Sequence, residues 1–181
     1  MRYLLTGEET ERLKFRLLQE DDYDEWINLF IGTDAARFLG MGHLHTAKEQ
    51  CDLWFQKGFA RYKNLEGGMN VLVDKATGKM VGQCGLLLQE VEGSIIMEVG
   101  YSVLPQYQGK GYAIEAAGKC RDYAFTNRFA DELYSTIHTE NISSVKVAEK
   151  NGMRLHKFVP DFKGMQVNLY RITREEWEQS K

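Results

Sequence analysis

Two glycines, Gly109 and Gly111, stand where a strand-like pattern over residues 95–104 gives way to a helical pattern. Glycines at such positions let the backbone bend tightly and remove side chains that would hold a ligand away. The helix that follows begins with backbone N–H groups that have no intrahelical acceptor. These amides and the helix dipole favour a negative group by roughly 0.3 to 1 kcal/mol, and more where the site is partly buried. The segment therefore predicts an anion site, for which a pyrophosphate is the natural occupant.

Three kinds of ligand could supply that pyrophosphate: a nucleoside triphosphate, a dinucleotide or coenzyme A. The triphosphate motif needs a Gly-Lys pair followed by Ser or Thr, whereas here Gly111 follows Lys110, which excludes it. Gly109, Gly111 and Ala113 give a weak match to the glycine-rich dinucleotide fingerprint. That fingerprint also needs an acid at the end of the next strand, where Glu140 keeps the possibility open.

Glu98 interrupts an apolar run that includes Ile96, Met97 and Val99. A carboxylate in such a run is costly unless it is paired, solvated or used in chemistry. Glu98 is therefore the candidate general base. The alternative is a structural carboxylate that pairs with a Lys or Arg or faces solvent.

The elements that must position these residues follow from hydrophobic periodicity. Strands are predicted over residues 12–18, 69–73, 80–88, 95–104, 133–139, 154–159 and 166–172, and helices over 23–31, after Thr46, after Gly111, from Asn141 and at Thr173. A turn at Thr77-Gly78 joins the second and third strands. This order predicts an α/β fold with a mixed sheet and helices on its faces.

Length and composition narrow the functional classes. The 181 residues predict a single domain over 1–181, with 43% hydrophobic and 27% charged residues. A net charge of −3 and the lack of a basic patch argue against a nucleic-acid partner, whereas mild acidity is compatible with an amine substrate. Three cysteines without a Cys-x-x-Cys pair argue against a disulfide framework or zinc site, and favour a reducing cytoplasm. No run reaches membrane-spanning length, so no membrane association is expected.

The turn after the fourth predicted strand resembles the GNAT acetyltransferase motif of Gln or Arg, two residues, Gly, one residue, and Gly or Ala. Gln108, Gly111 and Ala113 meet it, and Val103-x-Pro105 precedes it. The segments 141–144 and 149–153 resemble a second region of that family, with Met153 in place of an aromatic residue. The opening residues 10–13 resemble the ribosomal-protein N-terminal acetyltransferase (RimJ/RimL-like) branch.

The resemblance implies an α+β GNAT fold with a mostly antiparallel sheet of about six to seven strands, acting as a monomer or homodimer. It implies transfer of an acetyl group from acetyl-CoA to a primary amine, directly and without a Cys intermediate. The acceptor would be a protein N-terminus or a small-molecule amine. The residues that it assigns to the cofactor are Tyr101, Ser102, Val103, Gln108, Gly109, Lys110, Gly111, Tyr112, Ala113, Ile114 and Asn141. A catalytically silent acyl-CoA-binding module is the alternative.

Single residues receive roles on the same basis. Ser144 lies one helical turn after Asn141 and would protonate the departing thiolate. Many family members carry a Tyr four residues later, where this chain has Ala148, so the proton donor stays open. His138 is an alternative base or a structural histidine. The loop 32–45 is expected to help select the acceptor, and its histidines lack the further ligands that a metal site needs.

Overall fold

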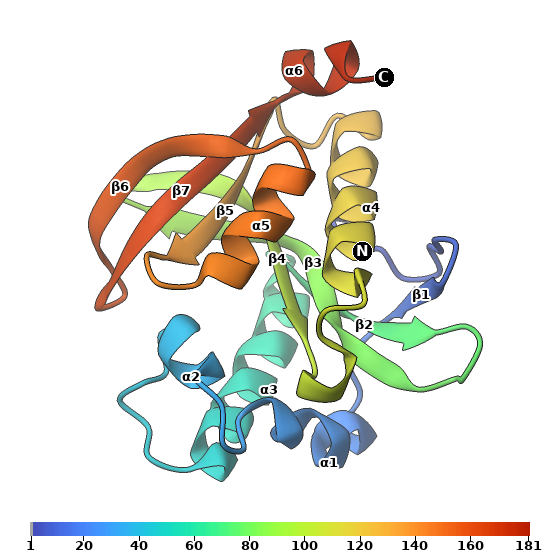
Figure 1. Cartoon of the computed structure of the whole chain (residues 1–181), viewed down its shortest axis with the longest axis vertical. Helices are drawn as coiled ribbons and strands as arrows, with labels where there is room; N and C mark the ends of the chain where they lie inside the picture. The colour runs from blue at the N-terminus through green and yellow to red at the C-terminus, as the bar shows by residue number, and fades with distance from the viewer. Residues whose placement is uncertain (1) are drawn as a thin grey trace.

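A computed structural model describes residues 2–181, which form a seven-stranded sheet in the order β1-β2-β3-β4-β5-β7-β6 (Figure 1). The strands are β1 (Leu13–Arg16), β2 (Gly67–Asp74), β3 (Met80–Val91), β4 (Ser94–Val103), β5 (Glu132–His138), β6 (Arg154–Phe162) and β7 (Met165–Thr173). β4 and β5 are parallel, and every other neighbouring pair is antiparallel. The sheet is thus mixed and mostly antiparallel, as predicted.

Six α-helices cover the sheet: α1 (Tyr23–Trp26), α2 (Ala35–Phe38), α3 (Ala47–Asn64), α4 (Tyr112–Thr126), α5 (Ile142–Lys150) and α6 (Arg174–Gln179). Successive strand residues point to opposite faces. Leu72 joins a core cluster with residues of α4, whereas its neighbour Val71 joins a cluster with residues of α1 and α3. Helices α4 and α5 therefore cover one face and α1 and α3 the other, as Figure 1 shows.

Helix starts follow the capping chemistry expected from their sequences. The Thr46 hydroxyl accepts a hydrogen bond from the Glu49 backbone N–H, and the Glu49 carboxylate accepts one from the Thr46 backbone N–H. Asn141 caps α5 in a similar way through the Ser144 N–H. Gly111, in contrast, begins α4 with no side-chain cap. The first amides of α4 thus lack the protein partner that the other two helices have.

The segment predicted as one helix over 23–31 is instead divided. Helix α1 ends at Trp26 and is followed by a 3-10 turn, Ile27–Leu29. A 3-10 turn has three residues per turn. Trp26 and Leu29, three residues apart, are both buried in the cluster beneath α3. Packing against α3 therefore decides the local geometry.

All three cysteines are free and buried. Cys51 lies in α3, while Cys84 of β3 and Cys120 of α4 face each other with their Sγ atoms 3.5 Å apart. Among residues 2–181, no helix combines the length and the apolar character needed to cross a membrane.

Candidate active site

The site begins at the seam between β4 and β5, the one parallel junction of the sheet. Its register contains a single pair, Glu98 with Tyr134, after which the two strands diverge. Beyond that point the Ser135 hydroxyl donates a hydrogen bond of 2.8 Å to the Val99 carbonyl, in place of a strand partner. A cavity of about 1000 Å³ opens along this seam. Its volume is at the upper end of the range of small-molecule sites.

At one end of the cavity lies the turn from β4 into α4. Gly109 and Gly111 adopt φ values of 76° and 81°, a left-handed conformation that favours glycine. The Gln108 side chain donates a 3.0 Å hydrogen bond to the Val103 carbonyl and so closes the turn. The first hydrogen bond of α4 runs from Glu115 N–H to the Gly111 carbonyl. The preceding amides therefore have no intrahelical acceptor, and they border the cavity.

The chain's opening segment braces this turn. Arg12 forms a 2.6 Å ion pair with Glu115 in the first turn of α4 and donates to the Lys110 carbonyl. Its guanidinium also stacks over the Tyr112 ring, 4.5 Å from the centroid. Thr10 donates a second hydrogen bond to Glu115. Residues 10–12, noted in the sequence for a family resemblance, thus hold the predicted anion site in place.

Glu98 lines the cavity away from the turn into α4 and is 9% exposed. Its neighbours Met97 and Val99 pack on the α4 face, so the Glu98 side chain projects on the α3 face. One carboxylate oxygen accepts a hydrogen bond of 3.2 Å from the Thr136 backbone N–H. Burial raises the pKa of Glu98, while that hydrogen bond and nearby cations oppose the rise. A carboxyl group with a raised pKa in a cavity is suited to proton transfer.

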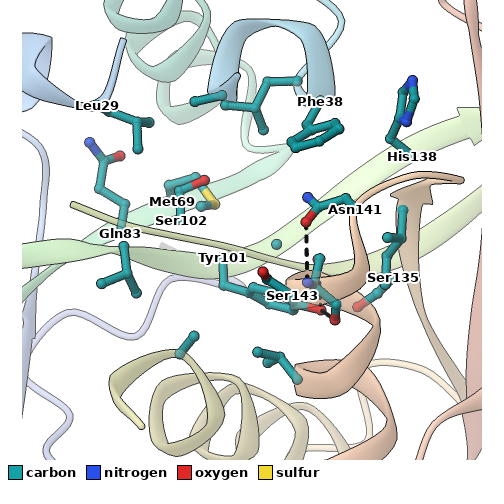
Figure 2. A pocket seen from close by; sticks show the side chains of 18 of the residues that line it. Leu29, Phe38, Met69, Gln83, Tyr101, Ser102, Ser135, His138, Asn141 and Ser143 are labelled. Atoms are coloured by element: carbon teal, nitrogen blue, oxygen red, sulfur yellow. Dashed lines mark hydrogen bonds between the residues drawn. The ribbon is translucent and has the colours of Figure 1, made fainter. Parts of the chain in front are cut away.

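Across β4, on the α4 face, Ser144 and Tyr101 form a hydroxyl pair. The Ser144 hydroxyl lies 3.2 Å from the Tyr101 phenol oxygen, and that phenol donates to the Ser144 carbonyl at 2.7 Å. Figure 2 shows Tyr101 close to Ser143 and Asn141 at the start of α5, with Met69 and Gln83 on the other side of β4. Burial raises the pKa of Tyr101. The phenol therefore keeps its proton at neutral pH.

Most residues predicted for the site line this one cavity. Those that do are Glu98, Tyr101, Ser102, Val103, Gln108, Gly109, Gly111, Tyr112, Ala113, Ile114, Asn141 and Ser144. Lys110 is not among the lining residues: its amine lies over the Tyr107 ring. Glu140, which kept the dinucleotide alternative open, forms an ion pair with Arg37 instead. His138 lines the cavity, with its ring against Phe38 and its Nδ1 accepting from the Glu140 N–H.

The loop 32–45 contributes to the cavity through a short helix that sequence patterns did not predict. Helix α2 places Phe38 against the cavity, and Gly40 and His43 follow it there. A Cβ added at Gly40 would lie 3.1 Å from Met165 Cε, so this loop touches the β6–β7 hairpin. The two segments together enclose the end of the cavity that contains Glu98.

Five basic residues that sequence reasoning did not select also line the cavity: Lys57, Arg61, Lys146, Lys150 and Lys163. The helical spacing of Lys57 with Arg61, and of Lys146 with Lys150, places each pair on one helix face. This spacing is the one feature of the sequence that could have indicated a basic surface on each helix. Which face borders the cavity depends on the tertiary fold.

Comparison with known proteins decides the family. The sequence profile of the acetyltransferase (GNAT) domain matches residues 12–154. The chain belongs to the GNAT acetyltransferases. Members of this family use acetyl-CoA as the acyl donor for N-acetyltransfer. The resemblance seen in the motif around Gly111 is thereby confirmed.

Similar proteins extend over nearly the whole chain. The uncharacterized protein YkkB of Bacillus subtilis (strain 168) is 31% identical over 150 residues, which cover 83% of this chain and 86% of YkkB. A crystal structure of the acetyltransferase from Agrobacterium tumefaciens str. C58 is 25% identical with a TM-score of 0.76, covering 95% of this chain and 96% of that one. The ribosomal-protein α-N-acetyltransferase RimL, solved in complex with coenzyme A, shares the fold at 14% identity and a TM-score of 0.70, covering 92% and 97%.

Proposed function

We propose that this GNAT enzyme transfers the acetyl group of acetyl-CoA directly to a primary amine, in a complex that holds both substrates at once. The amine belongs to a protein N-terminus or a small molecule. The observation that carries the proposal is one cavity with free helix amides at one end and a buried carboxylate further along the same strand. Glu98 is five residues upstream of Val103. That separation is about 16 Å of strand, which leaves room for an extended thioester arm between the two groups.

The donor end of the cavity fits the pyrophosphate of acetyl-CoA. A Cβ at Gly109 would meet no atom within 4 Å, so the turn is open to a ligand at that point. The amides from Gly109 to Ile114 would hold the phosphates, with Lys146 and Lys150 lining the cavity from α5. Backbone groups of residues 101–103 and the Asn141 amide would contact the pantetheine arm. When bound, acetyl-CoA supplies the activated acyl group.

Glu98 would deprotonate the acceptor. An amine must lose a proton to become a nucleophile, and a free Lys amine with a pKa near 10.4 is mostly charged at neutral pH. In the reaction the amine nitrogen forms a bond to the acetyl carbon as the carbon–sulfur bond breaks. The proton of the amine passes to the Glu98 carboxylate, directly or through a water.

Ser144, with Tyr101 beside it, would return a proton to the departing sulfur. In the structure the Ser144 hydroxyl donates to the Tyr101 phenol oxygen, 3.2 Å away. As the carbon–sulfur bond breaks, that hydroxyl would turn to donate its proton to the thiolate, solvent would restore the proton, and Tyr101 would orient the hydroxyl. This pair provides a donor although Ala148 occupies the position of the family's usual tyrosine. No cysteine is present among the described residues that line the cavity. The absence of such a nucleophile supports direct transfer over a Cys-bound intermediate.

Two measurements test the proposal. Calorimetric titration with acetyl-CoA should give saturable binding, and the lack of binding at millimolar ligand would contradict the donor assignment. Release of free CoA should then be followed over a panel of primary amines and N-terminal peptides. Turnover with any of them supports an enzyme, whereas binding without turnover across the panel would favour the silent acyl-CoA-binding module.

A further inference from the structure

Three basic side chains converge on the end of the cavity that contains Glu98. Lys57 and Arg61 come from α3, and Lys163 comes from the turn of the β6–β7 hairpin. Lys163 adopts a φ of 52°, and its amine donates a 3.0 Å hydrogen bond to the Gln89 side chain on β3. The hairpin is further tied to the β3–β4 turn by an ion pair between Lys157 and Glu92. The position of Lys163 is thus fixed by the hairpin geometry.

None of these three cations forms a close ion pair with a carboxylate of the described residues. Within residues 2–181, no carboxylate oxygen lies within 4.0 Å of the charged nitrogens of Lys57, Arg61 or Lys163. Elsewhere on α3, in contrast, Lys48 forms an ion pair with Asp52 one turn later. Like charges four residues apart on a helix cost roughly 0.2 to 0.5 kcal/mol. Lys57 and Arg61 are unpaired and four residues apart, so their repulsion slightly destabilises the fold. Folding alone therefore does not explain why both are present.

The three charges also influence one another. Partial removal of the Lys163 amine from water lowers its pKa, and the charges of Arg61 and Lys57 lower it further, against the opposing effect of Glu98. Arg61 uses one N–H group on the Leu88 carbonyl and keeps its other donors. Glu98 thus interacts with Lys163 and Arg61, and Lys57 adds a further positive charge near Lys163. An anion bound between Lys57, Arg61 and Lys163 would offset their mutual repulsion.

The location of the cluster separates it from the donor phosphates. Lys57 and Arg61 lie on the α3 face of the sheet, the face to which Glu98 projects, and they are close enough to Lys163 to affect its pKa. The α4 amides lie at the other end of β4, about 16 Å of strand away. Phe162, also in the hairpin, and Met69 provide the apolar part of this end of the cavity. This end of the cavity is therefore lined by apolar side chains together with the three cations.

We propose that the acceptor is a primary amine that carries an anionic group, a carboxylate or a phosphate, near the amine. This inference rests on the proposed function and specifies its substrate class. Lys57, Arg61 and Lys163 bind the anionic group and thereby direct the amine towards Glu98. Polyamines, which are purely cationic, are repelled by the same charges. The mildly acidic net charge of the whole chain is compatible with a cationic acceptor, but the local charges of the cavity are not.

The test uses acceptors in matched pairs, at saturating acetyl-CoA, with CoA release as the measurement. Free α-amino acids are compared with their carboxamides, and O-phosphoethanolamine is compared with ethanolamine, with spermidine as the cationic arm. The two pairs distinguish a carboxylate from a phosphate as the recognised group. We expect at least one anionic acceptor to exceed its neutral partner about tenfold in kcat/KM, a difference of about 1.4 kcal/mol. The amine of a carboxamide is less basic than that of the free acid, so amine ionisation does not produce this preference.

Variants identify the cations responsible. Lys57→Gln and Lys163→Gln should each reduce the ratio of anionic to neutral kcat/KM about threefold, while acetyl-CoA affinity measured by calorimetry stays within twofold. Lys63→Gln is the matched control, because Lys63 is exposed on the same helix and does not line the cavity. That variant should retain the ratio.

Several outcomes would overturn the inference without touching the proposed function. Equal turnover of acids and amides, or a preference for spermidine, would do so. If Lys163→Gln lowered kcat/KM equally for every acceptor, Lys163 would act only on Glu98. If the variant bound acetyl-CoA more weakly, Lys163 would belong to the donor site. If no amine in the wider panel released CoA, the proposed function itself would fail.

Discussion

Burial raises the pKa of the Glu98 carboxyl group. To act as a base, this group must be ionised. Activity should therefore fall as the pH drops through that raised pKa. Glu98→Gln preserves size and removes the base, so kcat/KM should fall at least about a hundredfold near pH 7. Acetyl-CoA affinity, measured by calorimetry, should be nearly unchanged because the donor amides lie at the far end of β4.

The rates should be compared from pH 6 to 9, since a neutral amine at high pH partly bypasses a missing base. Glu90→Gln, an exposed substitution on β3, provides the control and should retain activity. Wild-type rates in Glu98→Gln across this range would make Glu98 structural, and His138 or solvent would then be the base.

The same shift makes a prediction about stability. A carboxyl group whose folded pKa is raised stabilises the fold fully below its unfolded pKa, and this contribution is lost as the pH rises through the folded pKa. Glu98→Gln should therefore have a higher Tm than the wild type at neutral pH, with the difference closing as the pH approaches 4. The glutamine oxygen can still accept from the Thr136 N–H. Thermal unfolding of both proteins across this pH series is the measurement, and parallel curves would contradict the shift.

Ser144 and Tyr101 should behave as one unit if Tyr101 orients the Ser144 hydroxyl that protonates the departing sulfur. Ser144→Ala and Tyr101→Phe should each lower kcat by about a hundredfold, the lower end for general acid catalysis. The double variant should be no slower than either single one, because residues that act together show non-additive losses. Additive losses in this cycle would mean that the two hydroxyls act independently. Circular dichroism on each variant checks that the fold is retained.

At the scale of elements, the start of α4 depends on backbone conformation. Gly111 and Gly78 both adopt positive φ, 81° and 69°, but Gly111 lies in the cavity and Gly78 in the β2–β3 turn. Alanine at either position should cost roughly 1 to 2 kcal/mol of stability. Gly111→Ala should in addition weaken acetyl-CoA binding about tenfold, or about 1.4 kcal/mol. Equal acetyl-CoA affinity in the two variants, measured by calorimetry, would show that the turn does not hold the donor.

Sequence patterns predicted the long elements because each carries its own periodic signal. The strand–turn–helix around Gly109 and Gly111 is an example, and so is α3, which begins after Thr46 as predicted. Helix α2 spans only Ala35–Phe38, which is too short to show a period. The break after Trp26 follows from packing against α3, a contact that no local pattern contains.

One end of the site could be predicted from the sequence and the other could not. The donor end is built from one continuous segment, so Glu98 and Gly111 could be selected together. The acceptor end joins α2, α3 and the β6–β7 hairpin, and residues such as Lys57 and Lys163 become neighbours only in the folded chain. The hydroxyl of Tyr101 was also missed, because the family resemblance assigned Tyr101 only to the cofactor. Its hydroxyl role depends on α5 packing beside β4, which brings Ser144 within hydrogen-bonding distance.

At the scale of the whole molecule, the sheet consists of two parts, β1–β4 and β5–β7, joined at the seam by one registered pair. A donor bound along the seam would contact both parts. Acetyl-CoA should therefore raise the Tm, with a stabilisation of about 2.7 kcal/mol at a hundred times its Kd. Differential scanning fluorimetry measures this shift. NADH serves as the comparison, and an equal shift with it would revive the dinucleotide alternative.

The burial of all three thiols gives the protein an internal chemical reporter. Cys51, Cys84 and Cys120 have no exposed surface in the folded chain, so a thiol-reactive dye cannot reach them while the core is intact. During turnover such a dye records the sulfur of each released CoA. Upon unfolding it records the protein's own sulfurs instead, in a fixed ratio to the chain. One reagent can thus distinguish, in the same sample, catalysis by the folded enzyme from loss of the fold.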